Sequence, residues 1–282
     1  GMGLSLLDCA VIYEQLGRFL APGPYFDSTA MSAGALVHSG DASWQAKLLP
    51  AIATGDSIVV PAWLEPDNGF GAIGVQLRAR RDGDDYVLDG VKRHVFYARA
   101  AHKLLVLART GDEDESISLF IVDADSAGLS YEQQRTMASD TQYKLTFNQM
   151  RVPQSALVGA ENSGWKTWTT ALQENLVLLA AWAVGGADRA LEITVQYSKD
   201  REQFDKPIGA FQALAHYMAD ASTVVEGAKV LVLEAAWAHT EGKSIARLAP
   251  MAKLFGCKAF RDVTAMAQQV HGGIGFTLDY DI

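Results

Sequence analysis

Residues 197–212 have the sequence Tyr-Ser-Lys-Asp-Arg-Glu-Gln-Phe-Asp-Lys-Pro-Ile-Gly-Ala-Phe-Gln. A long stretch of apolar residues with helical spacing precedes this segment, and a second helical pattern begins at about Phe211. Pro207 and Gly209 lie between the two patterns, and both residue types interrupt helices and form turns. The segment therefore predicts two long helices joined by a tight polar turn.

A second informative segment lies near the end of the chain. Residues 269–276 have the sequence Gln-Val-His-Gly-Gly-Ile-Gly-Phe and follow another helical pattern. Glycine just after the last helical residue is typical of a helix C-terminus. This segment predicts a further helix end that is closed by glycines.

The residue types in these two segments suit a dinucleotide. Arginine can give a pyrophosphate two parallel charge-assisted hydrogen bonds, glutamine amides bind polar atoms, and phenylalanine offers a flat apolar surface. Glycines let the backbone approach a ligand closely. The candidate cofactor-binding residues in these segments are Arg201, Gln203, Phe204, Gln212, Gln269, Gly272 and Gly273. A simpler alternative stays open, in which Arg201 caps a helix C-terminus and the glycines only end one.

Together the segments resemble the acyl-CoA dehydrogenase family, through an R-x-Q-F-x-K-P-I-x-x-F-Q turn at 201–212 and a Q-x-x-G-G-x-G-F helix end at 269–276. The resemblance implies that both elements hold the adenosine and pyrophosphate half of FAD bound to a neighbouring subunit of a dimer or tetramer. It further implies an acyl-CoA substrate and an electron-transfer flavoprotein as acceptor. In the family's reaction a carboxylate removes the α-proton and the flavin accepts a hydride.

Charge and composition argue against other classes of partner. The net charge of -9 disfavours nucleic acid or an anionic membrane as the main partner. No apolar run reaches about 18 residues, so we expect no membrane-spanning helix. Cys9 and Cys257 form no spaced pattern and no secretory leader is evident, so we expect a cytoplasmic setting and no metal site.

The order of patterns along the chain predicts an α+β fold. Residues 1–56 are expected to form a partial N-terminal helical domain. Residues 57–158 are expected to form a central antiparallel β-domain that is barrel-like, and residues 159–282 an incomplete C-terminal α-helical bundle. The acyl-CoA dehydrogenase family has the same order, and the resemblance extends over essentially the whole chain.

The individual elements follow from periodicity and turn residues. Helices are predicted at 4–20, 28–39, 43–54, 164–200, 210–240 and 244–271, the third opened by an Asp41 or Ser43 cap. Strands are predicted at 58–60, 75–79, 86–88, 104–108, 119–122 and 144–147. Gly185 and Gly186 lie within a predicted helix, where they would allow close packing of another helix.

The segments that would face a flavin ring depart from the family pattern. At 64–71, in place of T-E-P-x-x-G-S-D, Leu64 replaces a flavin-bonding threonine and Phe70 a serine. At 92–97, in place of K-x-W-I-T-N, His94 replaces a stacking tryptophan and Phe96 a threonine. His94 and Phe96 could still stack on the ring and are candidate cofactor-binding residues. The alternative is that His94 is an ordinary packed residue.

The catalytic base is predicted on the first bundle helix. The resemblance implies that in many members the base is a glutamate after the G-G-x-G helix end, beyond Ile282, and that in others it lies on the first bundle helix. Counting back from Arg201 and Phe204 places this second position at Asn175, next to Glu174. One residue on a helix is a rotation of about 100°, so Glu174 would need a slight change of register. A partly buried Glu174 would have a raised pKa suited to a base, whereas a solvated helix glutamate is the alternative.

Three functional hypotheses remain open. The first is an FAD-dependent acyl-CoA dehydrogenase of fatty acid or lipid metabolism. The second is a non-catalytic subunit that completes the FAD site of a heteromeric acyl-CoA dehydrogenase, since the adenine-side motifs are kept and the flavin-edge residues are altered. The third is a flavin monooxygenase or nitroalkane-oxidase-like relative, because a fold does not determine its chemistry.

Overall fold

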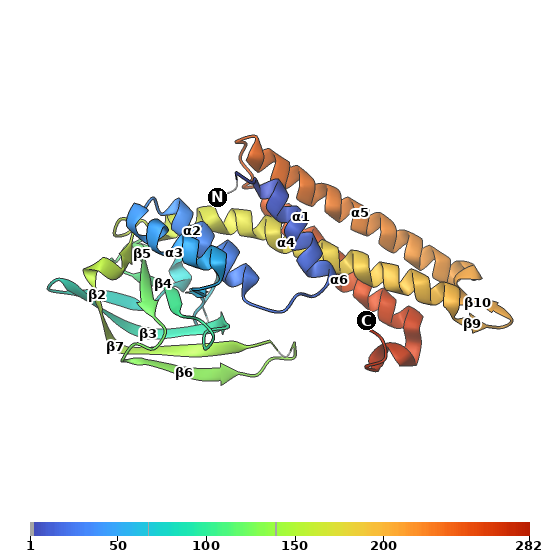
Figure 1. Ribbon diagram of the computed structural model, residues 1–282, viewed down its shortest axis with the longest axis horizontal. Helices are drawn as coiled ribbons and strands as arrows, with labels where there is room; N and C mark the ends of the chain where they lie inside the picture. The colour runs from blue at the N-terminus through green and yellow to red at the C-terminus, as the bar shows by residue number, and fades with distance from the viewer. Residues whose placement is uncertain (1–2, 67, 139) are drawn as a thin grey trace. The chain divides into compact units, whose positions relative to one another are not determined.

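The computed structural model describes residues 3–66, 68–138 and 140–282 (Figure 1). Asp67, in the predicted flavin segment, therefore lies outside the described residues. Contacts divide the chain into two compact units, which we call the helical unit (1–22 and 173–282) and the β-unit (23–172). The three-domain boundaries drawn from the sequence stay a prediction.

Long helices build the helical unit, as the periodicity predicted. They are α1 (Leu6–Arg18), α4 (Gly164–Asp200), which begins in the β-unit, α5 (Gln212–Thr240) and α6 (Leu248–His271). Between α4 and α5 the chain forms a short hairpin of β9 (Glu202–Gln203) and β10 (Lys206–Pro207), then the 3-10 turn η4 (Ile208–Ala210). A further 3-10 segment, η5 (Gly272–Phe276), follows α6.

Glycines let α1 and α4 approach until their backbones touch. A Cβ on Gly185 would lie 1.8 Å from the carbonyl oxygen of Glu14, and one on Gly17 would lie 1.9 Å from that of Trp182. A Cβ on Gly186 would lie 2.7 Å from the ring of Phe260 on α6. The predicted close packing at Gly185 and Gly186 is confirmed, because a Cβ would overlap the backbone of α1 at Gly185 and crowd the Phe260 ring at Gly186.

Three short helical segments open the β-unit. They are the π-helix η1 (Tyr25–Ser32), α2 (Ala33–His38) and α3 (Ala42–Thr54). Asp41 caps α3 as predicted, since its Oδ1 accepts hydrogen bonds of 3.1 Å from the backbone N–H groups of Ser43 and Trp44. The helix predicted at 28–39 is instead a π-helix followed by an α-helix.

An eight-stranded sheet forms the rest of the β-unit. Its strands are β1 (Val59–Ala62), β2 (Arg78–Asp82), β3 (Asp85–Phe96), β4 (Lys103–Arg109), β5 (Ile117–Asp123), β6 (Leu129–Gln134), β7 (Gln142–Pro153) and β8 (Leu157–Val158). The 3-10 turns η2 (Ala72–Gly74) and η3 (Gln154–Ala156) lie between β1 and β2 and between β7 and β8, which follow one another in the chain but are not paired in the described sheet. The α+β class predicted from the sequence is confirmed.

The sheet differs from the expected antiparallel barrel in two ways. Its strand order is β6-β7-β3-β2-β4-β5-β8, with β1 on β4, so the described strands form an open path rather than a closed barrel. Most neighbours are antiparallel, but β1 and β2 each pair with β4 in parallel. Parallel pairing is possible because the connections to β4 are long crossovers rather than hairpins.

Both faces of the central strands are buried. Along β4, Leu104 and Val106 belong to one apolar cluster, whereas Leu105 and Leu107 belong to another that also contains Trp168. Successive residues of a strand point to opposite faces, so this alternation places an apolar layer on each side of the sheet. Among the described residues, no helix is long and apolar enough to cross a membrane.

Candidate functional site

The ends of α4 and α6 meet through three aromatic rings. Tyr197 stacks on His271 with ring centroids 4.3 Å apart and planes inclined by 21°. Tyr280 contacts both rings edge-on, at 5.3 Å from Tyr197 and 5.2 Å from His271. The two segments singled out in the sequence, 197–212 and 269–276, therefore lie together in the folded helical unit.

The turn after α4 displays an aromatic residue at its tip. Phe204 and Asp205 have φ of 55° and 61°, and they form the two-residue loop between β9 and β10. Positive φ at both central residues is typical of a type I′ hairpin, in which a bulky residue such as Phe204 is strained. The Phe204 side chain is 86% exposed and meets Phe211 edge-on at 6.1 Å. The fold thus exposes the Phe204 ring to solvent from a residue whose backbone conformation is strained.

The other predicted adenine-side residues also face solvent. Arg201, Gln203, Gln212 and Gln269 are all exposed, and Arg201 has no ion-pair partner within the described part of the chain. A Cβ added to Gly272 or Gly273 would meet no atom of the described residues within 4 Å. Gly272 has φ 65° and ψ -139°, a conformation that essentially only glycine adopts. The glycines therefore end α6, and their backbone is accessible to a ligand next to the helix end.

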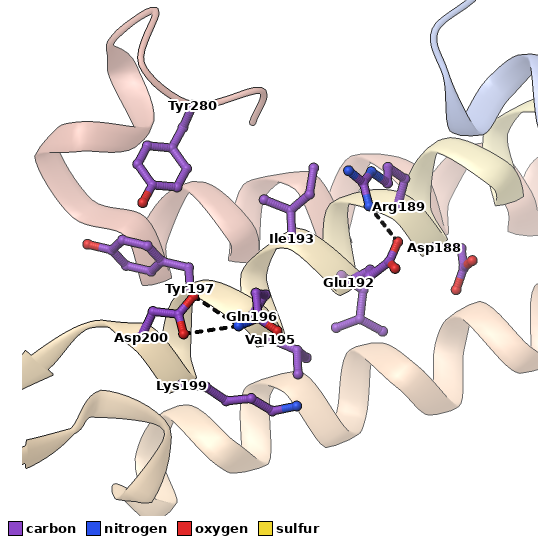
Figure 2. A pocket seen from close by; sticks show the side chains of 11 residues that line it. Asp188, Arg189, Glu192, Ile193, Val195, Gln196, Tyr197, Lys199, Asp200 and Tyr280 are labelled. Atoms are coloured by element: carbon purple, nitrogen blue, oxygen red, sulfur yellow. Dashed lines mark hydrogen bonds and ion pairs between the residues drawn. The ribbon is translucent and has the colours of Figure 1, made fainter.

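A groove of ≈ 470 Å³ runs along α4 and ends at Tyr197 and Tyr280 (Figure 2). Its polar side chains carry both signs of charge and largely satisfy one another. Arg189 bonds Glu192 at 2.7 Å, and the amide nitrogen of Gln196 bonds both oxygens of Asp200 at 2.9 and 3.0 Å. These internal pairs leave the groove without the surplus positive charge that would favour a pyrophosphate.

In the β-unit, a buried ion pair joins the two predicted flavin segments. The Nζ of Lys92 lies 2.6 Å from Oε1 of Glu65, with side-chain exposures of 0% and 5%. The backbone N–H of Leu77 donates to both oxygens of Glu65, and Arg93 N donates to Leu64 O at 2.8 Å. Burial lowers the pKa of Lys92 to about 8, although Glu65 opposes this shift. Lys92 and Glu65 stand in the two predicted flavin segments, although neither was among the predicted site residues.

His94 and Phe96 lie on β3 beside this ion pair. The register of β3 against β7 shifts between Lys92 and Val95, and His94 stands at this irregularity with φ 53°. Its backbone N donates to Gln134 Oε1 at 2.8 Å, and its ring Nδ1 lies 2.8 Å from Gln142 Oε1. His94 is exposed and Phe96 is half-buried. The histidine is therefore held by specific polar contacts rather than packed in a core.

Phe70 and Leu64, which replace hydroxyl residues of the family pattern, bring apolar surface to the same unit. Phe70 is 74% exposed and lies against Trp63, with ring centroids 6.0 Å apart. Trp63 in turn packs on buried Trp168 at 5.3 Å. Aromatic faces are thus available next to the predicted flavin segments, whereas hydroxyl donors at 64, 70 and 96 are absent from the sequence.

Glu174, the predicted base, lies on α4 in the helical unit. Its Oε1 is 2.9 Å from Nε2 of His239 on α5, and its side chain is 21% exposed. Burial raises the pKa of the nearby Cys9 thiol, and the charges of Asp8 and Glu174 add to this effect. Asn175 is 2% exposed, and its Nδ2 has no hydrogen-bond partner among the residues that the structure describes. The assignment of the base stays a prediction.

The residues present fit the adenosine and pyrophosphate half of FAD. Exposed Arg201 supplies a cation, Phe204 a free aromatic face, and Gly272 and Gly273 open backbone. These groups are what a dinucleotide needs from a protein surface.

Two family models match most of the chain. Residues 62–150 match the acyl-CoA dehydrogenase middle domain, and residues 162–282 match the acyl-CoA dehydrogenase C-terminal domain. The probable acyl-CoA dehydrogenase YngJ of Bacillus subtilis is 31% identical over 291 residues, which cover 100% of this chain and 76% of YngJ. The chain belongs to the acyl-CoA dehydrogenase family.

Solved structures share the fold of this chain. Butyryl-CoA dehydrogenase from Megasphaera elsdenii superposes with a TM-score of 0.93 at 28% identity, covering 99% of this chain and 75% of that one. An FAD complex of PigA superposes with a TM-score of 0.91 at 26% identity, over 99% of this chain and 75% of that one. Acyl-CoA dehydrogenases are FAD-dependent oxidoreductases, and the PigA structure contains FAD.

One relative is named together with an electron-transfer flavoprotein. The subunit CarC of the caffeyl-CoA reductase-Etf complex of Acetobacterium woodii is 29% identical to this chain, covering 100% of it and 76% of CarC.

Proposed function

We propose that this acyl-CoA dehydrogenase introduces an α,β double bond into an acyl-CoA thioester and passes the electrons to an electron-transfer flavoprotein. The observation that carries the proposal is the Tyr197–His271 stack, which joins the two motif segments into one exposed surface. On that surface Arg201 would bind the pyrophosphate, while Phe204 would contact the adenosine half of FAD bound to a neighbouring subunit. Gln203, Gln212 and Gln269 would add polar contacts.

When FAD is bound, its flavin would accept the hydride from the substrate. The chain's own residues would hold FAD and position the substrate's α-carbon near a base. Glu174 is the proposed base, and its contact with His239 would orient the carboxylate. In that role Glu174→Gln abolishes α-proton exchange of an acyl-CoA in deuterated buffer, whereas His239→Gln keeps it. Full exchange in Glu174→Gln would assign the base elsewhere.

The absorbance spectrum tests the proposal. The purified protein should carry a flavin band that bleaches under anaerobic conditions on addition of an acyl-CoA. Absence of bleaching with short-chain, long-chain and branched acyl-CoA thioesters, in a protein that does hold flavin, would contradict the proposed reaction.

A second candidate function is a subunit that completes the FAD site of an unlike partner. The loss of hydroxyls at Leu64, Phe70 and Phe96 favours it, because those positions would otherwise bond the flavin edge. Under this alternative the protein purifies without flavin, and a flavin band arises only when a partner acyl-CoA dehydrogenase subunit is co-expressed. Substituting Arg201 with Ala would then remove flavin from the mixed assembly.

A further inference from the structure

His94 occupies a strained bend of β3 that polar contacts hold from two neighbouring strands. Both His94 and Tyr97 have φ of 53°, which is uncommon for non-glycine residues. Gln134 on β6 accepts from the His94 backbone N at 2.8 Å, and Gln142 on β7 contacts its ring Nδ1 at 2.8 Å. Such strain persists only where the surroundings enforce it, and it often marks a functional site.

The contact between Gln142 and Asp140 decides which way the Gln142 amide faces. Gln142 is 8% exposed, and its Nε2 lies 2.5 Å from Oδ2 of Asp140. An ionised carboxylate can only accept hydrogen bonds, so the amide must direct its NH₂ group toward Asp140. The amide oxygen then faces the His94 ring and can only accept from it.

The charge state of Asp140 supports this orientation. Burial would raise the pKa of its carboxyl group, but hydrogen bonds from Thr136, from Gln142 and from its own backbone N–H, together with the charge of a protonated His94, outweigh burial and hold the pKa below its ordinary value. Asp140 is therefore ionised at neutral pH. A neutral His94 must then carry its proton on Nδ1 and a lone pair on Nε2.

We propose that Asp140 and Gln142 are positioning residues that fix His94 as the Nδ1-protonated imidazole, so that its Nε2 accepts a hydrogen bond from an N–H group of a ligand at this face of the β-unit. The inference rests on the proposed function, which supplies two ligands with N–H groups: the flavin ring and the pantetheine arm of CoA. His94 is exposed, and its Nε2 has no partner within the described residues, so it is available to such a donor.

The tautomer can be measured without any ligand. His102 in the same unit is a matched internal control, because its Nδ1 faces the backbone N–H of Ile58 at 3.0 Å and must carry the lone pair. Long-range ¹H–¹⁵N correlation spectra above pH 8 should therefore show opposite tautomers for His94 and His102. A His94 ring protonated on Nε2 would overturn the inference.

Two substitutions test the positioning residues. Gln142→Leu should let the His94 ring populate both tautomers, and Asp140→Asn should do so in part, because an amide can donate as well as accept. Gln45→Leu is the control, since Gln45 also loses two hydrogen bonds, to Leu36 O and Val37 O, but is remote in sequence from this network. An unchanged His94 tautomer in both Gln142→Leu and Asp140→Asn would remove the two residues from this role.

Ligand binding tests what Nε2 does. His94→Asn keeps a donor for Gln142 but removes the Nε2 acceptor, so it should weaken binding of FAD or of butyryl-CoA by about three- to tenfold. A loss of affinity for FAD alone would identify the flavin as the hydrogen-bond donor, and a loss of affinity for butyryl-CoA alone would identify CoA. His102→Asn should change neither affinity. Equal affinities of wild type and His94→Asn for both ligands would overturn the inference, whereas a wild-type protein that binds neither would overturn the proposed function with it.

Discussion

Tyr197 of α4 and His271, the last residue of α6, stack face to face at 4.3 Å. His271 is 4% exposed, and its Nδ1 lies 2.8 Å from the carbonyl oxygen of Ala267 one turn earlier. That contact fixes the histidine ring in position, so Tyr197 rests on a rigid platform. The stack therefore sets the distance between the turn that carries Arg201 and the glycines that follow α6.

Tyr197→Ala should loosen this junction. Removing the ring loses an aromatic pair worth about 1 kcal/mol and leaves a void beside His271, so we expect a loss of about 2–3 kcal/mol in the free energy of unfolding. FAD occupancy should fall as well. Tyr197→Phe keeps the stack and is the control. Thermal unfolding and the flavin absorbance of the purified variants provide the measurements, and wild-type stability in Tyr197→Ala would contradict the structural role.

Arg201→Ala should weaken the retention of FAD. A guanidinium that makes charge-assisted bonds to a pyrophosphate contributes about 1.5–3 kcal/mol, which corresponds to roughly a 10- to 100-fold change in affinity. Lys199→Ala removes an exposed cation two residues away and should have little effect. Flavin release on dilution, followed by fluorescence, measures both. Equal release from the two variants would argue that Arg201 only caps α4.

Phe204→Gly should lower the affinity for FAD while leaving the stability of the fold nearly unchanged. Glycine relieves the left-handed strain at this position, which offsets the greater entropy that glycine gives the unfolded chain, so stability should stay within about 1 kcal/mol of wild type. Affinity for FAD should fall because the exposed ring is lost. Asp205→Gly, at the adjacent position with φ 61°, keeps the ring and should retain FAD. Calorimetry and flavin titration together test the pair.

Gly185→Ala should be strongly destabilising. Its Cβ would lie 1.8 Å from Glu14 O and 2.7 Å from Glu14 C, so α1 would have to move away from α4. We expect a cost of about 3 kcal/mol or more, at the upper end for overpacking. Gly227→Ala is the matched control on α5, where a Cβ meets only the Phe255 ring at 3.6 Å. That change should stabilise the protein by up to about 1 kcal/mol through helix propensity.

Asp27 should make stability fall as pH rises. Burial raises its pKa to about 6 from an ordinary value of 3.8, so between these values the folded protein binds more protons than the unfolded chain. The stability that the neutral carboxyl contributes is present below about pH 4 and is lost as pH rises through about 6. By pH 7 the loss is on the order of 2–3 kcal/mol.

Asp27→Asn removes this titration. The variant should match wild type near pH 4 and exceed it in stability at pH 7, as measured by denaturant unfolding across that range. Asp84→Asn changes an exposed carboxylate and should leave the slope as in wild type. An identical pH dependence in Asp27→Asn and wild type would show that Asp27 is solvated.

Much of the helical architecture follows from sequence pattern, because long helices are dominated by local periodicity. The predicted range 164–200 coincides with α4, and α5 and α6 begin within a few residues of their predicted starts. Strand β6 was missed because only Leu129 and Tyr131 in Leu129–Gln134 carry apolar surface to the core, and no residue of the strand is fully buried. Its antiparallel pairing with β7 stabilises the strand, and this contact cannot be read from the residues of β6 themselves.

The candidate site was only partly accessible from the sequence. Arg201 and Gly272 stand in contiguous motifs, so their association with a dinucleotide could be inferred. The contacts of His94 could not, because Gln134 and Gln142 lie on later strands and only strand pairing brings them to it. The same holds for Glu174, whose partner His239 comes from the far end of α5.

The Lys92–Glu65 ion pair constrains how this chain can change. Replacing either member leaves an unpaired charge in the interior, which lowers the free energy of unfolding by about 3–5 kcal/mol. Replacing both with apolar residues often leaves that free energy unchanged. Each single replacement is thus strongly destabilising, although the ion pair and an apolar pair are both compatible with a stable fold. The lysine and the glutamate are therefore expected to be kept together or lost together wherever this loop and strand recur.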